Sequence, residues 1–343
     1  MKKRFLAFGL AGMMMLGALA GCGGTASTDA GNTGDTADTA QTDNVSDTAT
    51  GKTLKIGLSM AVRDQFLTSM ETAAKTKAEE AGNVQLDVVD ANNDVSVQIS
   101  HVQTWAADNY DAAIVCLVNN DSAQEIINAA NGMNIVFVNR QPDIGLLKDN
   151  IVYVGTDESL YGKNQGEFLA KYFKDQGKTE INAVLFQGVL GLDNVIKRTQ
   201  SVKDALAAAG IKVSYVYEDT AEWDRAKAMD KFTQFMGSGK SFDAVICNND
   251  EMALGVIEAM KTTGEKKVLC PVVGIDATEV GCQAVKAGEM LCTVFQDPVA
   301  QGGGAVECAV GLANGTPIEN LKDNYYNIVP QLVTKDNVDQ YIK

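Results

Sequence analysis

The 343-residue sequence has a single histidine, His101, and its seven cysteines form no C-x-x-C pair. A Ser-His-Asp triad could be built only around His101, and a zinc site would need carboxylates. His101 lies in a helical pattern, which favours a surface or core position over a catalytic one. No P-loop occurs, and the glycines at 302–304 lack the strand and turn of a phosphate-binding loop. These absences argue against nucleotide enzymes, metalloenzymes and triad hydrolases.

Basic residues are also scarce, at 29 against 44 acidic residues, and they form no basic patch. Both observations argue against nucleic acid as a partner. The excess of acidic residues favours solubility, and we draw no functional conclusion from it.

The N-terminus has the three parts of a secretory signal: a basic start, a short apolar run from Phe5 and small residues before a cleavage site. The run is too short and too rich in Gly and Ala for a membrane span. It ends in Leu19-Ala20-Gly21-Cys22, which resembles a bacterial lipobox. The resemblance implies a signal peptide over 1–21, cleavage before Cys22 and acyl chains on that residue, which would anchor the protein stably. Plain secretion with an incidental cysteine is the alternative.

Residues 22–52 contain no aromatic residue and consist almost entirely of small and polar types. Such a segment cannot bury a core, so we expect a disordered tether between the anchor and a folded domain. Beyond it, six cysteines lie mostly in apolar contexts and are predicted to be small core residues, with one disulfide left open. They are Cys116, Cys247, Cys270, Cys282, Cys292 and Cys308.

From residue 53, apolar strand-like runs alternate with helical segments, which predicts an α/β protein with doubly wound parallel sheets. The first unit has strands at 54–60, 86–90, 112–117 and 135–139, with helices at 66–81, 95–108 and 122–131 between them. Residues 151–157 look like a crossing segment, after which the alternation restarts with helices at 161–176, 194–209, 223–236, 251–261 and 279–287. The strands between them are at 182–186, 212–216, 242–247, 272–275 and 292–296, and a helix at 301–313 and a strand at 326–329 follow. Two similar α/β lobes are therefore expected.

Polar residues follow the strand-like runs in both units, where open α/β sheets place their ligand crevice. The stretch Cys247-Asn248-Asn249-Asp250 is the clearest example. Taken singly, such residues are explained as turns and helix caps. Their recurrence favours a shared cleft. They are Arg63-Asp64-Gln65-Phe66, Asn139-Arg140-Gln141, Leu192-Asp193-Asn194 with Arg198, Trp223-Asp224, Asn249-Asp250, Asp276 and Gln296-Asp297.

Two of these clusters add an aromatic residue, Phe66 or Trp223. An aromatic ring covers the apolar face of a pyranose while charged and amide groups bind the hydroxyl rim. Core packing is the alternative for both residues, although the polar neighbours of Trp223 favour a cleft rim. Trp105, inside a helical pattern, is assigned to packing.

These motifs resemble the periplasmic sugar-binding proteins of ABC transporters, nearest to the galactose/glucose-binding type and more distantly to the ribose-binding type. The likeness runs from about residue 53 to 315. It rests on Ile56-Gly57 with Asp64-Gln65-Phe66, Val136-Phe137-Val138-Asn139, Thr220-Ala221-Glu222-Trp223-Asp224, Asn248-Asn249-Asp250-Glu251-Met252-Ala253 and Val273-Gly274-Ile275-Asp276-Ala277. The resemblance implies a Venus-flytrap fold with three crossings between the lobes. The N-terminal lobe would comprise 53–155 and 297–322, the C-terminal lobe 156–296, and a hinge-associated segment 323–343.

The same resemblance supplies ligand-binding residues from both lobes: Asp64, Phe66 and Asn139 from the first, Arg198, Trp223, Asn249 and Asp276 from the second, and Gln296 near the hinge. Arg140 and Asn194, which also follow strands, are added to the predicted ligand-binding set. Three positions depart from the galactose/glucose type: Leu192 replaces a histidine, Asn194 an aspartate and Gln296 an asparagine. The calcium loop of that type has no counterpart between 172 and 182, so no structural calcium is expected there. No other metal and no cofactor is assigned from the sequence.

The sequence therefore predicts a lipid-anchored, monomeric receptor on the extracytoplasmic face of a bacterial membrane. It would capture a monosaccharide, a hexose such as galactose or glucose being favoured, and deliver it to an ABC transporter permease without turnover. A pentose, an inositol or another polyol is the first alternative. A carbohydrate-processing enzyme that uses Asp64 and Asp276 is a remote one. Delivery of the closed state to a sensory receptor is compatible with transport.

Overall fold

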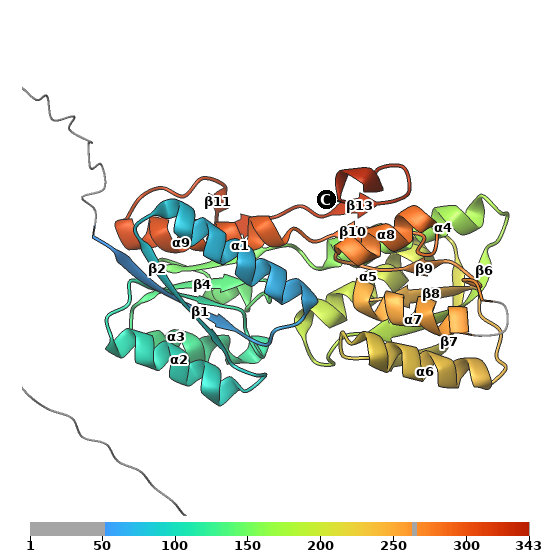
Figure 1. The fold of residues 1–343 in the computed structure, drawn as a ribbon, viewed down its shortest axis with the longest axis horizontal. Coiled ribbons are helices and arrows are strands. Elements are labelled where there is room, and N and C mark those ends of the chain that lie inside the picture. The colour runs from blue at the N-terminus through green and yellow to red at the C-terminus, as the bar shows by residue number, and fades with distance from the viewer. Residues whose placement is uncertain (1–51, 263–265, 343) are drawn as a thin grey trace, which may run out of the picture. The chain divides into compact units, whose positions relative to one another are not determined.

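The computed structural model describes residues 52–262 and 266–342, and the predicted signal peptide, tether and acylated Cys22 lie outside them. The first lobe contains a seven-stranded sheet in the order β11-β12-β5-β4-β3-β1-β2, parallel except for the β11–β12 pair. Helices α1 and α9 cover one face of this sheet, and α2 and α3 cover the other (Figure 1). Its elements are β1 Leu54–Met60, α1 Gln65–Ala81, β2 Val84–Asp90, α2 Val95–Ala107, β3 Ala112–Val115, η1 Asn120–Ser122, α3 Ala123–Ala130, β4 Asn134–Val138, η2 Ile144–Leu146, β5 Ile151–Gly155, α9 Pro298–Asn314, β11 Leu321–Lys322 and β12 Tyr325–Asn327.

The second lobe contains a four-stranded parallel sheet in the order β7-β6-β8-β9. A two-stranded antiparallel ribbon, β10 with β13, adjoins it through single parallel bridges at Val273–Cys292 and Asp276–Phe295. Its elements are α4 Ser159–Lys174, β6 Glu180–Gln187, α5 Asp193–Ala208, β7 Lys212–Thr220, α6 Arg225–Gly237, β8 Ala244–Cys247, α7 Asp250–Thr262, β9 Val272–Val273, α8 Glu279–Ala287, β10 Thr293–Phe295, β13 Gln331–Val333 and η3 Val338–Gln340. The doubly wound α/β fold predicted from the sequence is confirmed.

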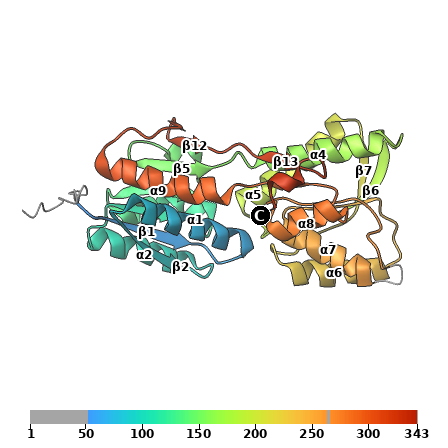
Figure 2. The same ribbon diagram turned by 45° about the horizontal axis from the view of Figure 1, so that its top comes forward.

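The chain passes between the two lobes at residues 156–158, 296–297 and 328–330, which we call the first, second and third crossings. The segment 323–343, predicted to be associated with the hinge, contributes to both lobes. Strand β12 pairs with β5 of the first sheet, whereas β13 pairs with β10 of the second lobe (Figure 2). The strand predicted at 326–329 therefore ends earlier, at Asn327, and the sequence pattern did not reveal β13.

Acidic residues at the strand ends begin several helices, as the turn interpretation of the sequence requires. The carboxylates of Asp64, Asp224 and Asp297 accept backbone N–H groups in the first turns of α1, α6 and α9. Two predicted helix starts are corrected by these caps. Helix α9 begins at Pro298 and not at Gln301, and α6 begins at Arg225, so Trp223 precedes the helix in a left-handed turn.

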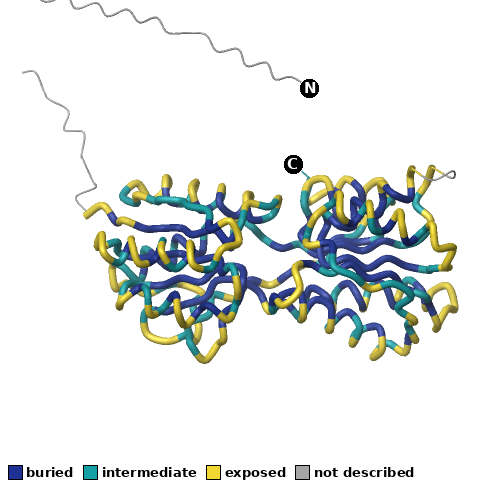
Figure 3. Tube along the Cα trace, turned by 90° about the horizontal axis from the view of Figure 1, so that it is seen from below, coloured by how far each residue is buried: buried dark blue, intermediate teal, exposed yellow. Residues whose placement is uncertain are grey.

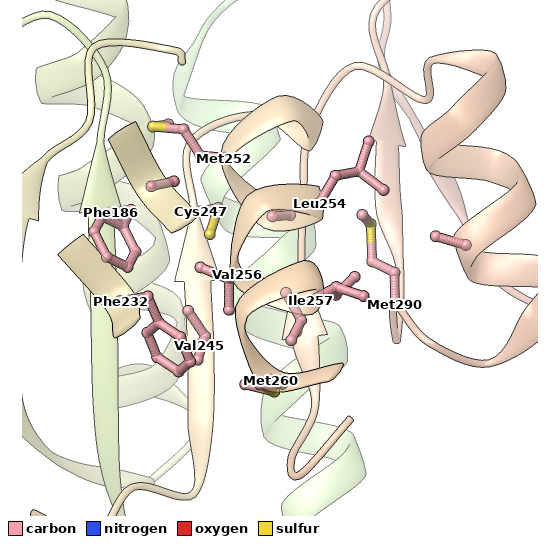
Figure 4. Packing of buried hydrophobic residues seen from close by; sticks show 14 of the residues in the cluster. Phe186, Phe232, Val245, Cys247, Met252, Leu254, Val256, Ile257, Met260 and Met290 are labelled. Atoms are coloured by element: carbon pink, nitrogen blue, oxygen red, sulfur yellow. The ribbon is translucent and has the colours of Figure 1, made fainter. Parts of the chain in front are cut away.

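Both sheets are buried on their two faces, and exposed residues lie mainly on the outer surfaces of the helices and in loops (Figure 3). Trp105 packs against Gly57, where a Cβ atom would come within 2.3 Å of the indole, so its assignment to packing is confirmed. In the second lobe, Cys247, Phe186 and Phe232 belong to one hydrophobic cluster with residues of α7 and lie on one side of that helix (Figure 4). The six described cysteines are free thiols, and all except Cys270 are buried, which confirms the core prediction for five of them.

Candidate functional site

A small cavity lies between the lobes at the carboxyl ends of their strands. It offers about 50 Å³ to the centre of a water molecule, several times the roughly 10–15 Å³ that a single water needs on the same scale. A small molecule suits this space. All ten sequence-predicted ligand residues line it: Asp64, Phe66, Asn139, Arg140, Asn194, Arg198, Trp223, Asn249, Asp276 and Gln296. Their contact with a ligand remains a prediction.

Three of these residues have backbone conformations that side-chain-bearing residues rarely adopt. The φ angles are 66° at Asn139, 68° at Trp223 and 121° at Asp276. Positive φ is tolerated by asparagine but is an outlier for a bulky residue such as tryptophan. Backbone strain of this kind is concentrated at functional sites, where the surrounding structure holds it in place. Asn139, Trp223 and Asp276 therefore lie on constrained backbone at the cavity wall.

The first lobe presents mainly acceptors to the cavity. One carboxylate oxygen of Asp64 caps α1 by accepting the Leu67 N–H at 2.7 Å, which leaves the other oxygen for a ligand. Burial raises the pKa of Asp64, although backbone N–H groups and Arg140 oppose this. The side-chain amide of Asn139 donates to Gln301 Oε1 at 3.0 Å, so its own oxygen is left to accept.

Arg140 is the donor of the first lobe. Its Nη1 atom donates to the carbonyl oxygens of Leu117 and Val118 at 2.9 and 3.0 Å. These contacts hold the guanidinium at the cavity wall, while its remaining N–H groups are still available to a hydroxyl or ring oxygen.

The second lobe presents a mixture of amide donors. Asn249 Oδ1 accepts the Met252 N–H at the start of α7, and Asn194 Oδ1 accepts the Val195 N–H, each at 3.0 Å. Because the oxygen of each amide is already bonded, the NH₂ group is the part of each side chain that can donate to a ligand. Gln296 accepts a hydrogen bond from Arg198 through its oxygen, which leaves its NH₂ group as a donor.

Asp276 contributes a second carboxylate to the cavity wall. Its side chain is only 5% exposed, and its carboxylate accepts no hydrogen bond from any residue in the described ranges. The nearest cation is Arg198, with Nη1 3.8 Å from Oδ1. Burial raises the pKa of Asp276 well above its usual value, which Arg198 only partly offsets. Because this carboxylate lines the cavity, hydroxyl groups of a ligand can donate to it.

A second layer of buried groups holds these residues. Asp250 accepts hydrogen bonds from the Thr293 hydroxyl at 2.6 Å and from the Thr278 N–H at 2.9 Å, which fixes the turn that carries Asp276. Gln165 donates to the carbonyl oxygens of Cys247 and Gly274, at the ends of two neighbouring strand segments of the second lobe. Side chains that do not line the cavity therefore hold the cavity residues in position.

The lobes also contact one another directly beside the cavity. Lys197 Nζ of α5 donates to Gln141 Oε1 of the first lobe at 2.7 Å, and the Asp193 N–H donates to Asn120 Oδ1 at 3.3 Å. Helix α5 therefore carries both a cavity residue, Arg198, and contacts with the opposite lobe.

Comparison with known proteins identifies the family. Residues 56–317 match the family described as periplasmic binding protein domain. The chain is 36% identical to a putative rhizopine-binding protein of Rhizobium meliloti, over 87% of this chain and 94% of the relative. It is 33% identical to a D-galactose/methyl-galactoside binding periplasmic protein of Haemophilus influenzae, over 82% and 89%. Among solved structures, an ABC transporter solute-binding protein of Bacillus halodurans with bound myo-inositol has a TM-score of 0.77 and 35% identity, over 84% of this chain and 97% of that one.

The chain belongs to the periplasmic binding protein family. Its two-lobed fold is that of the type I proteins of the family, and its relatives are extracytoplasmic solute-binding proteins of ABC transporters, not enzymes. His101 is half-buried on α2, contacts Ser59 Oγ at 3.1 Å and lies outside the cavity, and burial lowers its pKa.

Some residues of the site were not predicted. Leu67 and Glu251 also line the cavity, near predicted residues, as does Gln65, which the sequence placed among the cleft candidates but not among the ligand-binding residues. Gln301 and Glu158, which hold Asn139 and Arg198, are buried and lie far along the chain from their partners, so no local signal marked them. Leu192 is buried and does not line the cavity, and no ligand contact is assigned to it.

Gly188 gives a test of the indole position in this binding protein. A Cβ atom at Gly188 would lie 2.1 Å from Trp223 Cζ2, so Gly188→Ala must displace the indole from its place in the cavity wall. We expect this variant to weaken ligand binding measurably in a calorimetric titration. The matched control is Gly237→Ala at the end of α6, where a Cβ atom meets nothing within 4 Å. That control should keep full affinity, and equal affinity of both variants would contradict the expectation.

Proposed function

We propose that this periplasmic binding protein captures one ring-shaped polyol of monosaccharide size and delivers it to an ABC transporter permease. The observation that carries the proposal is the cavity between the lobes, where acceptors, amide donors and an indole surround a space for one small molecule. A polyol hydroxyl both donates and accepts, so it matches the mixture of Asp64 and Asp276 with Arg140 and Asn194. Contacts from both lobes favour the closed form on binding.

We propose myo-inositol, or a closely related cyclitol, as the first ligand to test. The similarity to the solute-binding protein of Bacillus halodurans with bound myo-inositol supports this choice. A hexose, galactose or glucose, is the second candidate because of the similarity to the galactose-binding relative. Trp223 and Phe66 suit either ligand, since both present C–H groups on the faces of a six-membered ring.

A panel of myo-inositol, galactose, glucose, ribose and xylitol separates these ligands in a thermal-shift experiment. A ligand that binds only the native state raises its apparent stability, by about 2.7 kcal/mol at a concentration one hundred times Kd. The proposal predicts the largest shift with myo-inositol and recovery of the unchanged ligand after binding. If no member of the panel shifts the transition, the proposed ligand class is wrong; conversion of the ligand would favour an enzyme.

We also propose that the mature protein is a lipoprotein anchored through Cys22. This rests on the Leu19-Ala20-Gly21-Cys22 sequence and on the polar segment that follows it. In the native host, Cys22→Ser is expected to abolish incorporation of labelled fatty acid and to move the protein from the membrane fraction to the soluble one. Unlabelled wild-type protein in the soluble fraction would show that the chain is secreted without an anchor.

A further inference from the structure

The guanidinium of Arg198 is held entirely inside the protein. Its side chain is 3% exposed, and its Nε atom donates to Glu158 Oε2 at 2.6 Å. Its Nη1 atom donates to the carbonyl oxygen of Asn248 at 3.0 Å, and its Nη2 atom donates to Gln296 Oε1. Arg198 therefore has a defined orientation at the cavity wall, set by partners on three segments.

Two of these partners lie in different crossings between the lobes. Glu158 ends the first crossing, at 156–158, and Gln296 begins the second, at 296–297. Arg198 itself lies on α5, whose neighbouring Lys197 contacts the first lobe through Gln141. One buried cation thus joins two of the three chain segments that must change conformation if the lobes move.

Glu158 differs from the other groups around Arg198 because it does not line the cavity. Its side chain is 2% exposed, and Arg198 is the one residue in the described ranges to which its carboxylate is bonded. Removing one partner of a buried ion pair leaves the other charge buried without compensation, which is costly. This ion pair also fixes the orientation of the guanidinium, so that its remaining N–H groups face Asp276 and the cavity.

We infer that Glu158 is a positioning residue for ligand binding, which acts through Arg198 and connects the first crossing to the ligand. This inference rests on the proposed capture of a polyol. It predicts that removal of the Glu158 charge weakens binding although Glu158 never touches the ligand. It also predicts that the effect disappears when Arg198 is replaced by lysine, whose ammonium lacks the fixed, planar set of N–H donors that bonds Glu158, Asn248 and Gln296.

The test is a double-mutant cycle with calorimetric titration of myo-inositol and of galactose into four proteins: wild type, Glu158→Gln, Arg198→Lys and the double variant. Glu158→Gln, which keeps the shape and an acceptor oxygen, is expected to raise Kd by about tenfold or more, as the loss of a charge-assisted contact would. In the Arg198→Lys background the same change should alter Kd by less than about twofold, because coupled sites are not additive.

Glu71→Gln is the matched control. Glu71 is also a buried glutamate paired with an arginine, with Arg63 Nε 2.7 Å from its carboxylate, and neither residue lines the cavity. This variant should lose stability without a change in Kd. Unchanged binding by folded Glu158→Gln, or full additivity in the cycle, would overturn the inference and leave the proposed function intact. A wild-type protein that binds neither myo-inositol nor galactose would overturn both.

Discussion

Asp276→Asn is expected to weaken polyol binding roughly ten- to a hundredfold, in line with about 1.5–3 kcal/mol for a hydrogen bond to a charged group. The carboxylate is buried, accepts no hydrogen bond from the described residues and faces the cavity. An asparagine of the same shape keeps one acceptor oxygen but loses the charge and the second acceptor. Titration calorimetry of the wild type and the variant with the same ligand measures the loss.

The same substitution is expected to stabilise the ligand-free protein at neutral pH. Burial raises the pKa of Asp276 in the folded state, so folding favours its protonated form. The resulting loss of folding free energy is absent below the unfolded-state pKa of about 3.9. It grows as the pH rises toward the raised pKa of the folded state. The variant should therefore unfold at a higher temperature than the wild type at pH 7, and the difference should vanish near pH 4.

Asp243→Asn supplies a control of opposite sign. Asp243 accepts the Asn182 N–H at 2.8 Å and pairs with Lys178, and these contacts lower its pKa. Its contribution to stability is present above the unfolded pKa and is lost as the pH falls. Asp243→Asn should therefore destabilise the protein at neutral pH and leave Kd unchanged. Equal ligand affinity of the wild type and Asp276→Asn, or a less stable Asp276→Asn at pH 7, would refute the role given to Asp276.

Trp223→Ala is expected to weaken binding at least tenfold, a loss of about 1.4 kcal/mol. The indole lines the cavity and packs directly against the backbone of Gly188. Its ring centroid lies 5.7 Å from the Arg198 guanidinium carbon. Its removal exposes the apolar face of a bound ring and leaves a gap in the cavity wall. Trp223→Phe, which keeps an aromatic face, should lose much less affinity. Full affinity of the alanine variant in a titration would disprove stacking against Trp223.

The α/β fold could be predicted because its signals are local. Continuous apolar runs such as Ala112–Val115 report burial on both faces, and the helices between them follow at regular intervals. The residues at which some helices and strands begin or end could not be predicted as well, because they depend on capping contacts and on strand pairing. Strand β7 extends to Thr220 because it pairs with β6 beyond a register shift at Ala183, which no periodicity in β7 reveals.

The cavity could also be anticipated, because strand ends of a parallel sheet lie along one edge and each carried a polar residue. The sequence offered two interpretations of these residues, as helix caps or as cavity residues. Both are correct for Asp64, which caps α1 and lines the cavity. The supporting layer could not be found in this way. Glu158 is 40 residues from Arg198, and Gln301 is 162 residues from Asn139, so only the folded chain brings these pairs together.

The central claim is that groups of both lobes hold one polyol between them. The most direct measurement is the Kd of myo-inositol or galactose, whichever binds the wild type more tightly, for two chemically matched variants, Asp64→Asn in the first lobe and Asp276→Asn in the second. An asparagine in place of Asp64 can still cap α1, so each change removes one carboxylate facing the cavity. Weaker binding by both variants is the predicted result. If only one of them binds more weakly, or neither does, the ligand is not shared between the lobes.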